Sequence, residues 1–94
     1  MEVHHIIEKR FYKALGLSKS QARKYIACIP LDKDLHKTIS KRVNNAVKNR
    51  GGIWKIKDVN VLREICNEVY KDMPELKKIC NQVINNRHRL KKLK

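Results

Sequence analysis

Residues 32–48, DKDLHKTISKRVNNAVK, are the stretch that decides the expected fold. Apolar residues recur there at the spacing of one helical face, which predicts a helix with one buried side. At about 100° per residue, that side centres on Ile39 and Val43, and lysines gather on its flank. The residues expected to be buried are Leu35, Ile39, Val43, Ala46 and Val47.

Two short strands are expected before this helix, at 3–7 (VHHII) and at 26–29 (IACI), where Pro30 ends the second. Between them, residues 8–15 have a helical composition that stops at Gly16, a residue type that often ends helices. These elements predict a small β component beside a mainly helical chain.

Helix-capping residues divide the remainder of the chain. A short helix ending at Tyr25 is expected to be capped by Ser18 or Ser20. Beyond the long helix, Asp58 is a good cap for another helix, and Pro74 is well placed to begin the last one. These last two helices are expected to form an antiparallel hairpin.

The expected fold is therefore mainly α with a small β element (α+β), in a single domain over residues 1–94. A chain of 94 residues suits one modest hydrophobic core. We expect a core unit at 2–48 followed by a helical extension at 53–90.

The composition points to an anionic partner. Lys and Arg number 23 against 9 acidic residues, which gives a net charge of +14, while 41% of the residues are apolar. The apolar fraction indicates a folded body, and the phosphate backbone is the commonest partner of such a basic surface. An anionic membrane or an acidic protein could also use it. No apolar stretch is long enough for a signal sequence or a membrane span, so we expect no membrane association and a monomer.

The three cysteines form no CxxC pair, which argues against a structural zinc site. Cys66 and Cys80 fall at apolar positions of helical patterns, where a reduced cysteine acts as a small hydrophobic residue. The odd count, completed by Cys28, fits a reducing compartment, and one bridge with one free thiol is the alternative.

Three histidines are candidates for chemistry. His36 lies between the apolar stripe and the lysines of the long helix, a position suited to a metal ligand that meets a phosphate. The alternative is a polar residue at a core boundary. His4 and His5 are neighbours on an extended segment and so point to opposite faces, unless the segment bends. Their alternative is a solvated pair near the terminus.

The segments 3–11 (VHHIIEKRF), 15–17 (LGL) and 29–31 (IPL), followed by His36 and Ile39, resemble HNH-like nucleases, also called ββα-metal or His-Me finger nucleases. The likeness is strongest to the compact C-terminal toxin modules of bacterial polymorphic and contact-dependent toxins. It covers about residues 2–47 and implies a ββα-metal-like core.

The resemblance implies that His4 and His36 are the two metal ligands and that His5 is the general base. It also implies one divalent metal ion, which could be Mg, Mn, Zn or Ni, since imidazoles accept several metals. These modules commonly carry an asparagine, which tethers the site loop, where this chain has Ala27. Either another group replaces that tether or activity is reduced.

Further residues are assigned around these histidines. Glu8 either orients the catalytic His5 or pairs with Arg10, and Arg10 is a candidate for binding nucleic acid. The other candidates for phosphate binding are lysines spaced four residues apart along one side of the long helix. The alternative is that these lysines only form a solvated helix face. They are Lys33, Lys37 and Lys41.

Two remaining features are interpreted conservatively. Trp54, between Ile53 and Ile56, is expected to anchor in the core rather than to stack on a base. The basic C-terminus at 87–94 is expected to be a frayed tail rather than a second clamp.

Together these observations predict a metal-dependent endonuclease that hydrolyses phosphodiester bonds of nucleic acid. DNA is favoured as the substrate, and RNA, including transfer RNA, is the alternative. The resemblance further implies a toxin module at the C-terminal end of a larger secreted or surface protein. It would act in the cytoplasm of a target cell and would have a cognate acidic immunity protein. The alternative function is a non-catalytic, basic, helical protein that binds DNA or RNA.

Overall fold

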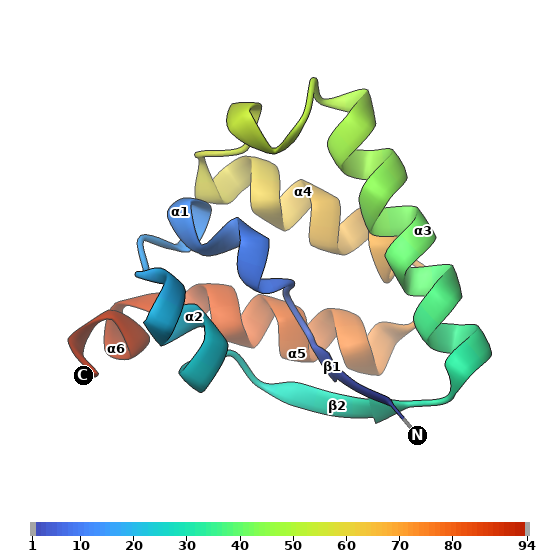
Figure 1. Ribbon diagram of the computed structural model, residues 1–94, viewed down its shortest axis with the longest axis horizontal. Helices are drawn as coiled ribbons and strands as arrows, with labels where there is room; N and C mark the ends of the chain where they lie inside the picture. Colours follow the sequence, from blue (N-terminus) through green and yellow to red (C-terminus); the bar gives the residue numbers. More distant parts are fainter. Residues whose placement is uncertain (1, 94) are drawn as a thin grey trace.

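The computed structural model describes residues 2–93, which form a mostly helical chain with one two-stranded antiparallel sheet (Figure 1). This confirms the α+β class. Strands β1 (Glu2–His5) and β2 (Cys28–Leu31) pair with His4 opposite Ile29. Met1 and Lys94, the two ends of the expected 1–94 domain, lie outside the described residues.

Three short helices connect the strands: η1 (Lys9–Phe11), α1 (Tyr12–Leu15) and α2 (Lys19–Tyr25). Gly16 ends α1 as predicted, because its φ of 72° is a left-handed conformation that glycine adopts without a steric penalty. Ser18, rather than Ser20, caps α2. Its hydroxyl accepts from the backbone N–H of Gln21, and the Gln21 side chain accepts from the backbone N–H of Ser18, both at 3.0 Å.

The second strand lies two residues later than the sequence predicts. Pro30, expected to end it, lies within β2 opposite Val3, and the strand ends at Leu31. In a sheet of two strands both strands are edges, where a residue that lacks an N–H is tolerated. Beyond the end of β1, the backbone N–H of Ile6 still donates to the Ala27 carbonyl at 2.8 Å.

Helix α3 (Lys33–Asn49) forms where the long apolar stripe predicts it. The Asp32 side chain caps it by accepting from the Leu35 N–H at 2.8 Å. Leu35 itself is half-buried, whereas the other four predicted residues of the stripe are buried. The helix packs against both β1 and α4 (Val59–Val69), so its first turn lies beside the sheet.

Asp58 caps α4 and Pro74 begins α5 (Pro74–Asn85), as predicted. Helices α4 and α5 run in opposite directions, which confirms the hairpin (Figure 1). Cys66 and Cys80, both buried, join these helices in a disulfide, and Cys28 is free and exposed. The structure thus has one bridge and one free thiol, because the hairpin brings the two Cα atoms to 6.5 Å, within bridging range.

The expectation of a frayed C-terminal tail is wrong for the described part, because residues 87–92 form helix α6 (Arg87–Lys92). It packs against α2, where the Gln21 amide donates to the carbonyls of Lys91 and Leu93 at 2.8 and 2.7 Å. Within residues 2–93, the search for a helix long and apolar enough to span a membrane finds none.

Candidate functional site

The structure brings His4 and His36 together. His4, on β1, is only 5% exposed, and His36, in the first turn of α3, is half-buried. Their ring centroids lie 5.2 Å apart and their planes meet at 82°. Thirty-one intervening residues separate them in sequence, so the contact depends on the packing of α3 against β1.

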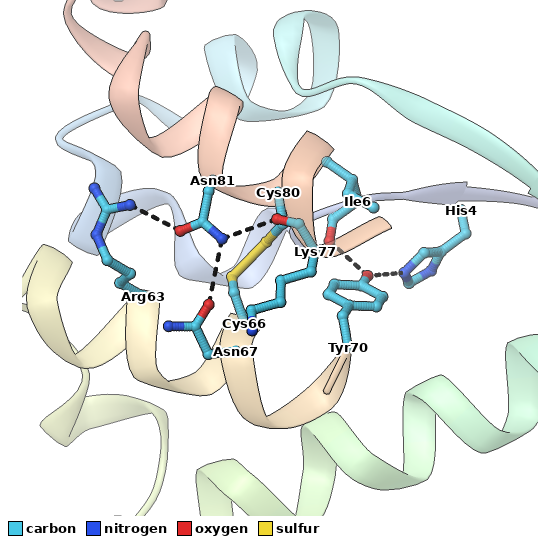
Figure 2. Close-up of a disulfide and its surroundings, with 9 residues drawn as sticks. All are labelled: His4, Ile6, Arg63, Cys66, Asn67, Tyr70, Lys77, Cys80 and Asn81. Atoms are coloured by element: carbon cyan, nitrogen blue, oxygen red, sulfur yellow. Dashed lines mark hydrogen bonds between the residues drawn. A yellow bond between two sulfur atoms is a disulfide. The ribbon is translucent and has the colours of Figure 1, made fainter. Parts of the chain in front are cut away.

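The Tyr70 hydroxyl holds the ring of His4. It lies 3.3 Å from Nε2 of His4, and it donates its own hydrogen to the Ile6 carbonyl at 2.7 Å (Figure 2). Because that hydrogen is committed to Ile6, the hydroxyl oxygen can only accept from His4. We infer that Nε2 of His4 carries the proton and that Nδ1 keeps its lone pair.

The surroundings keep the imidazole of His4 neutral and the hydroxyl of Tyr70 protonated. Burial, with a smaller contribution from the neighbouring imidazoles of His36 and His5, lowers the pKa of His4 to about 4. Burial also raises the pKa of Tyr70 well above its ordinary value, with help from the Glu8 carboxylate. His4 is therefore neutral at physiological pH, which is the form that can bind a metal.

The spacing of the two rings fits a shared cation. Two imidazoles bound at about 2.1 Å with a tetrahedral angle have centroids roughly 5 Å apart, and His4 and His36 are at 5.2 Å. Within residues 2–93, no group of three or more His, Cys, Asp or Glu side chains is arranged to hold a metal ion. A cation at this pair would therefore take its remaining ligands from water or from a phosphate.

His5 lies apart from the pair, as the alternation of side chains along a strand requires. Its Nε2 donates to the Arg23 carbonyl at 3.1 Å, near the end of α2. His5 is the last residue of β1, and the chain bends at residues 6 and 7. A backbone carbonyl of α2 thus tethers the ring. The sequence assigns no residue to this role, because Ala27 stands where the resemblance leads one to expect a tethering asparagine.

Glu8 pairs with Arg10 at 2.8 Å between Oε1 and Nε, which favours the second of its two expected roles. Burial raises the pKa of Glu8, while Arg10 and His36 act in the opposite direction, so the carboxyl is close enough to sense His36. Arg10, expected to bind nucleic acid, also donates to Asn44 on α3 at 2.8 Å. Its guanidinium is thereby held between the N-terminal segment and α3.

The three lysines predicted to bind phosphate, Lys33, Lys37 and Lys41, are exposed on α3. They belong to the same helix as His36, and Lys37 is its direct neighbour in sequence. The placement is compatible with phosphate binding and equally with a solvated helix face.

No protein-family model, curated protein or solved structure matches this chain. The resemblance to HNH-like nucleases therefore stays an expectation, and the roles of the site residues depend on their chemistry and geometry.

Trp54 is exposed, contrary to the expectation of a core anchor. It is 75% exposed in η2 (Ile53–Lys55), a 3-10 turn in which residues three apart share a side. The half-buried Ile53 and the buried Ile56 are such a pair, so both face inward and Trp54 faces out. The expectation of a core anchor treated the three apolar residues as one buried group, which a 3-10 turn does not allow.

Sequence reasoning also missed Tyr70 as a site residue. It follows Leu62 and Cys66 at intervals of four, so the buried stripe of α4 continues to it. A tyrosine at the buried end of such a stripe needs a polar partner for its hydroxyl. That requirement was the available signal, but nothing in the sequence indicates His4 as one of the partners.

Replacing Tyr70 with phenylalanine is expected to lower the free energy of unfolding by about 1–3 kcal/mol, because the Ile6 carbonyl and His4 Nε2 each lose a partner. Urea unfolding at pH 7 measures this change. Tyr12→Phe, at a half-buried tyrosine, is the control and should stay within about 0.5 kcal/mol of the parent. Equal values for the two variants would contradict the inferred role of Tyr70.

Proposed function

We propose that this chain is a metal-dependent endonuclease that hydrolyses phosphodiester bonds, with residues 2–48 acting as an HNH-like, ββα-metal core. DNA is the favoured substrate and RNA the alternative. The observation that carries the proposal is the 5.2 Å contact between the rings of His4 and His36. Two histidines from distant parts of the chain meet there, and the more buried one is kept neutral.

His4 and His36 are proposed to hold one divalent cation, with Nδ1 of His4 as one of the donor atoms. A divalent ion in such a position neutralises charge that grows on the phosphate and on the leaving oxygen. Tyr70 supports this step by fixing the tautomer of His4, as partners of metal-binding histidines generally do. Glu8, whose pKa responds to His36, adds negative charge beside the pair.

His5 is proposed to take the proton of the attacking water. With Nε2–H donated to the Arg23 carbonyl, Nδ1 is the ring atom of the neutral imidazole that has a free lone pair. The bond to Arg23 fixes the ring without using that atom. The exposed lysines of α3 are proposed to bind flanking phosphates, which would position the backbone without selecting a base sequence.

The biological setting in the proposal is that of a toxin module at the C-terminal end of a larger protein, acting in a target cell's cytoplasm. An acidic immunity protein is proposed as the partner that blocks it. The net charge of +14 supports a partner of opposite charge, because complementary charge accelerates association.

The test is cleavage of plasmid DNA and of total RNA by the purified chain, with Mg²⁺, with Mn²⁺ and with EDTA. We expect cleavage products with at least one of the cations. In the reaction with EDTA, which removes the cation, we expect the substrate to stay intact, because neither histidine can replace the charge of the ion. Comparing the two substrates distinguishes DNA from RNA as the target.

Equal cleavage in EDTA would contradict the metal requirement. The absence of products in every reaction, combined with retained binding to the same nucleic acids, would support the non-catalytic binding protein instead. The specific observation that favours this second candidate function is the exposed groove at Trp54, which basic side chains line.

A further inference from the structure

A groove of about 670 Å³ lies on the surface between the short N-terminal helices and η2. Its size is within the range of roughly 300–1,000 Å³ typical of small-molecule sites. Two aromatic rings, Tyr12 and Trp54, line it. The cations that line it are Lys9, Arg10, Lys13, Lys19, Arg23 and Lys57.

No acidic side chain is among the described residues that line this groove. Each aromatic ring has an ammonium group over it: Lys13 Nζ lies 5.8 Å from the centroid of Trp54, and Lys19 Nζ lies 5.8 Å from that of Tyr12. Aromatic rings that lie beside lysine ammonium groups are suited to a ligand that is both flat and anionic.

The exposure of Trp54 has a structural cause in the preceding turn. Gly51 and Gly52, with φ of 89° and 101°, let the chain turn sharply after α3 into the short η2 helix. That turn buries Ile56 and leaves the indole 75% exposed at the groove. The indole face at this concave, basic surface is therefore available for stacking against a ligand.

We propose that this groove binds an unpaired nucleotide of single-stranded nucleic acid, with its base stacked on Trp54 and its phosphates among the lysines. The inference extends the nucleic-acid partner of the proposed function and does not require hydrolysis. Bases inside a duplex are already stacked on one another, so unpaired bases are the ones that stack most readily on a ring of the protein surface.

The groove also adjoins the candidate catalytic residues. Arg10, which lines it, pairs with Glu8, and the Arg23 carbonyl, from another lining residue, accepts from His5. A strand held on Trp54 would therefore continue toward His5. This placement makes the groove a subsite for a nucleotide flanking the proposed cleavage position.

Trp54 is the only tryptophan of the chain, so its fluorescence reports on this groove alone. The experiment titrates the protein in EDTA with an eight-nucleotide oligo(dT), an eight-nucleotide oligo(U), an eight-base-pair duplex and inorganic polyphosphate. We expect quenching by at least one of the single strands, which separates DNA from RNA, and little quenching by polyphosphate, which has charge but no bases.

Affinities of the variants are measured by anisotropy of labelled single strands. Trp54→Ala should weaken binding by about fivefold to 100-fold, whereas Trp54→Phe should stay within about threefold because it retains a stacking face. Lys13→Gln tests charge in the groove, and Lys78→Gln, on exposed α5 surface outside it, is the matched control with a smaller expected effect.

Unchanged affinity of Trp54→Ala would overturn the proposal, as would equal quenching by polyphosphate or tighter binding of the duplex. Because these titrations contain no metal, they are independent of cleavage. Binding at Trp54 without any nuclease activity would contradict only the proposed catalysis. Cleavage without binding at Trp54 would contradict only the proposed role of the groove.

Discussion

Replacing His5 with glutamine is expected to reduce the rate of phosphodiester cleavage at least about 100-fold, the lower end of what a general base contributes. Glutamine can still donate a hydrogen bond to the Arg23 carbonyl, which now accepts from His5 Nε2 at 3.1 Å. It has no group that takes a proton from water at neutral pH. The variant therefore separates the chemical role from the structural one, and initial rates on plasmid DNA with saturating Mg²⁺ or Mn²⁺ measure it.

Two controls make this result specific. His88→Gln changes an exposed histidine of α6 and should cleave at the parent's rate. The His5→Gln variant should also bind oligonucleotides and unfold in urea as the parent does. A His5→Gln protein that cleaves at the parent's rate would remove this histidine from the mechanism, whereas a loss of rate accompanied by a loss of stability would point to a structural role.

The sequence predicts much of the fold because most of its signals are local. Gly16, Asp58 and Pro74 each act within one turn of a helix, and each is found where it was expected. The second strand was expected two residues too early because proline was taken to end it. Proline is excluded from central strands, and this two-stranded sheet has no central strand.

The candidate site was predictable only in part. The contact of His4 with His36 could be expected from the family resemblance, and packing places the two rings together. Tyr70 and the Arg23 carbonyl could not be expected, because both act across more than fifteen residues of sequence and one is a backbone atom that has no sequence signature. The same limit explains why the docking of α6 by Gln21 was missed.

Trp54 shows a different kind of failure. Three apolar residues at 53, 54 and 56 fit an alternating strand or a 3-10 turn, and the two differ in which of them face the core. The sequence alone cannot choose between them. The difference matters for function, because a strand would bury the only tryptophan in the core, whereas the 3-10 turn exposes it at the groove.

Acid is expected to destabilise the metal-free fold through His4. The folded state lowers the pKa of His4 to about 4, whereas the ordinary value in an unfolded chain is about 6.5, so the unfolded chain binds more protons between these two pH values. The contribution of His4 to the free energy of unfolding is fully present above about pH 6.5 and is lost as the pH falls toward 4. The expected loss between pH 7 and pH 4 is about 3 kcal/mol of unfolding free energy, measured by urea unfolding in EDTA.

His4→Gln isolates this contribution, because glutamine does not titrate but can still donate to the Tyr70 hydroxyl. The variant should be less sensitive than the parent across this range by about the same 3 kcal/mol. The raised pKa of Glu8 gives a slope of opposite sign, and it is present in both proteins, so the comparison cancels it. His88→Gln should retain the parent's pH dependence. If the curves of the parent and His4→Gln were parallel, His4 would not be held neutral by its burial beside His36 and His5, and its readiness to bind a cation at neutral pH would lose its physical basis.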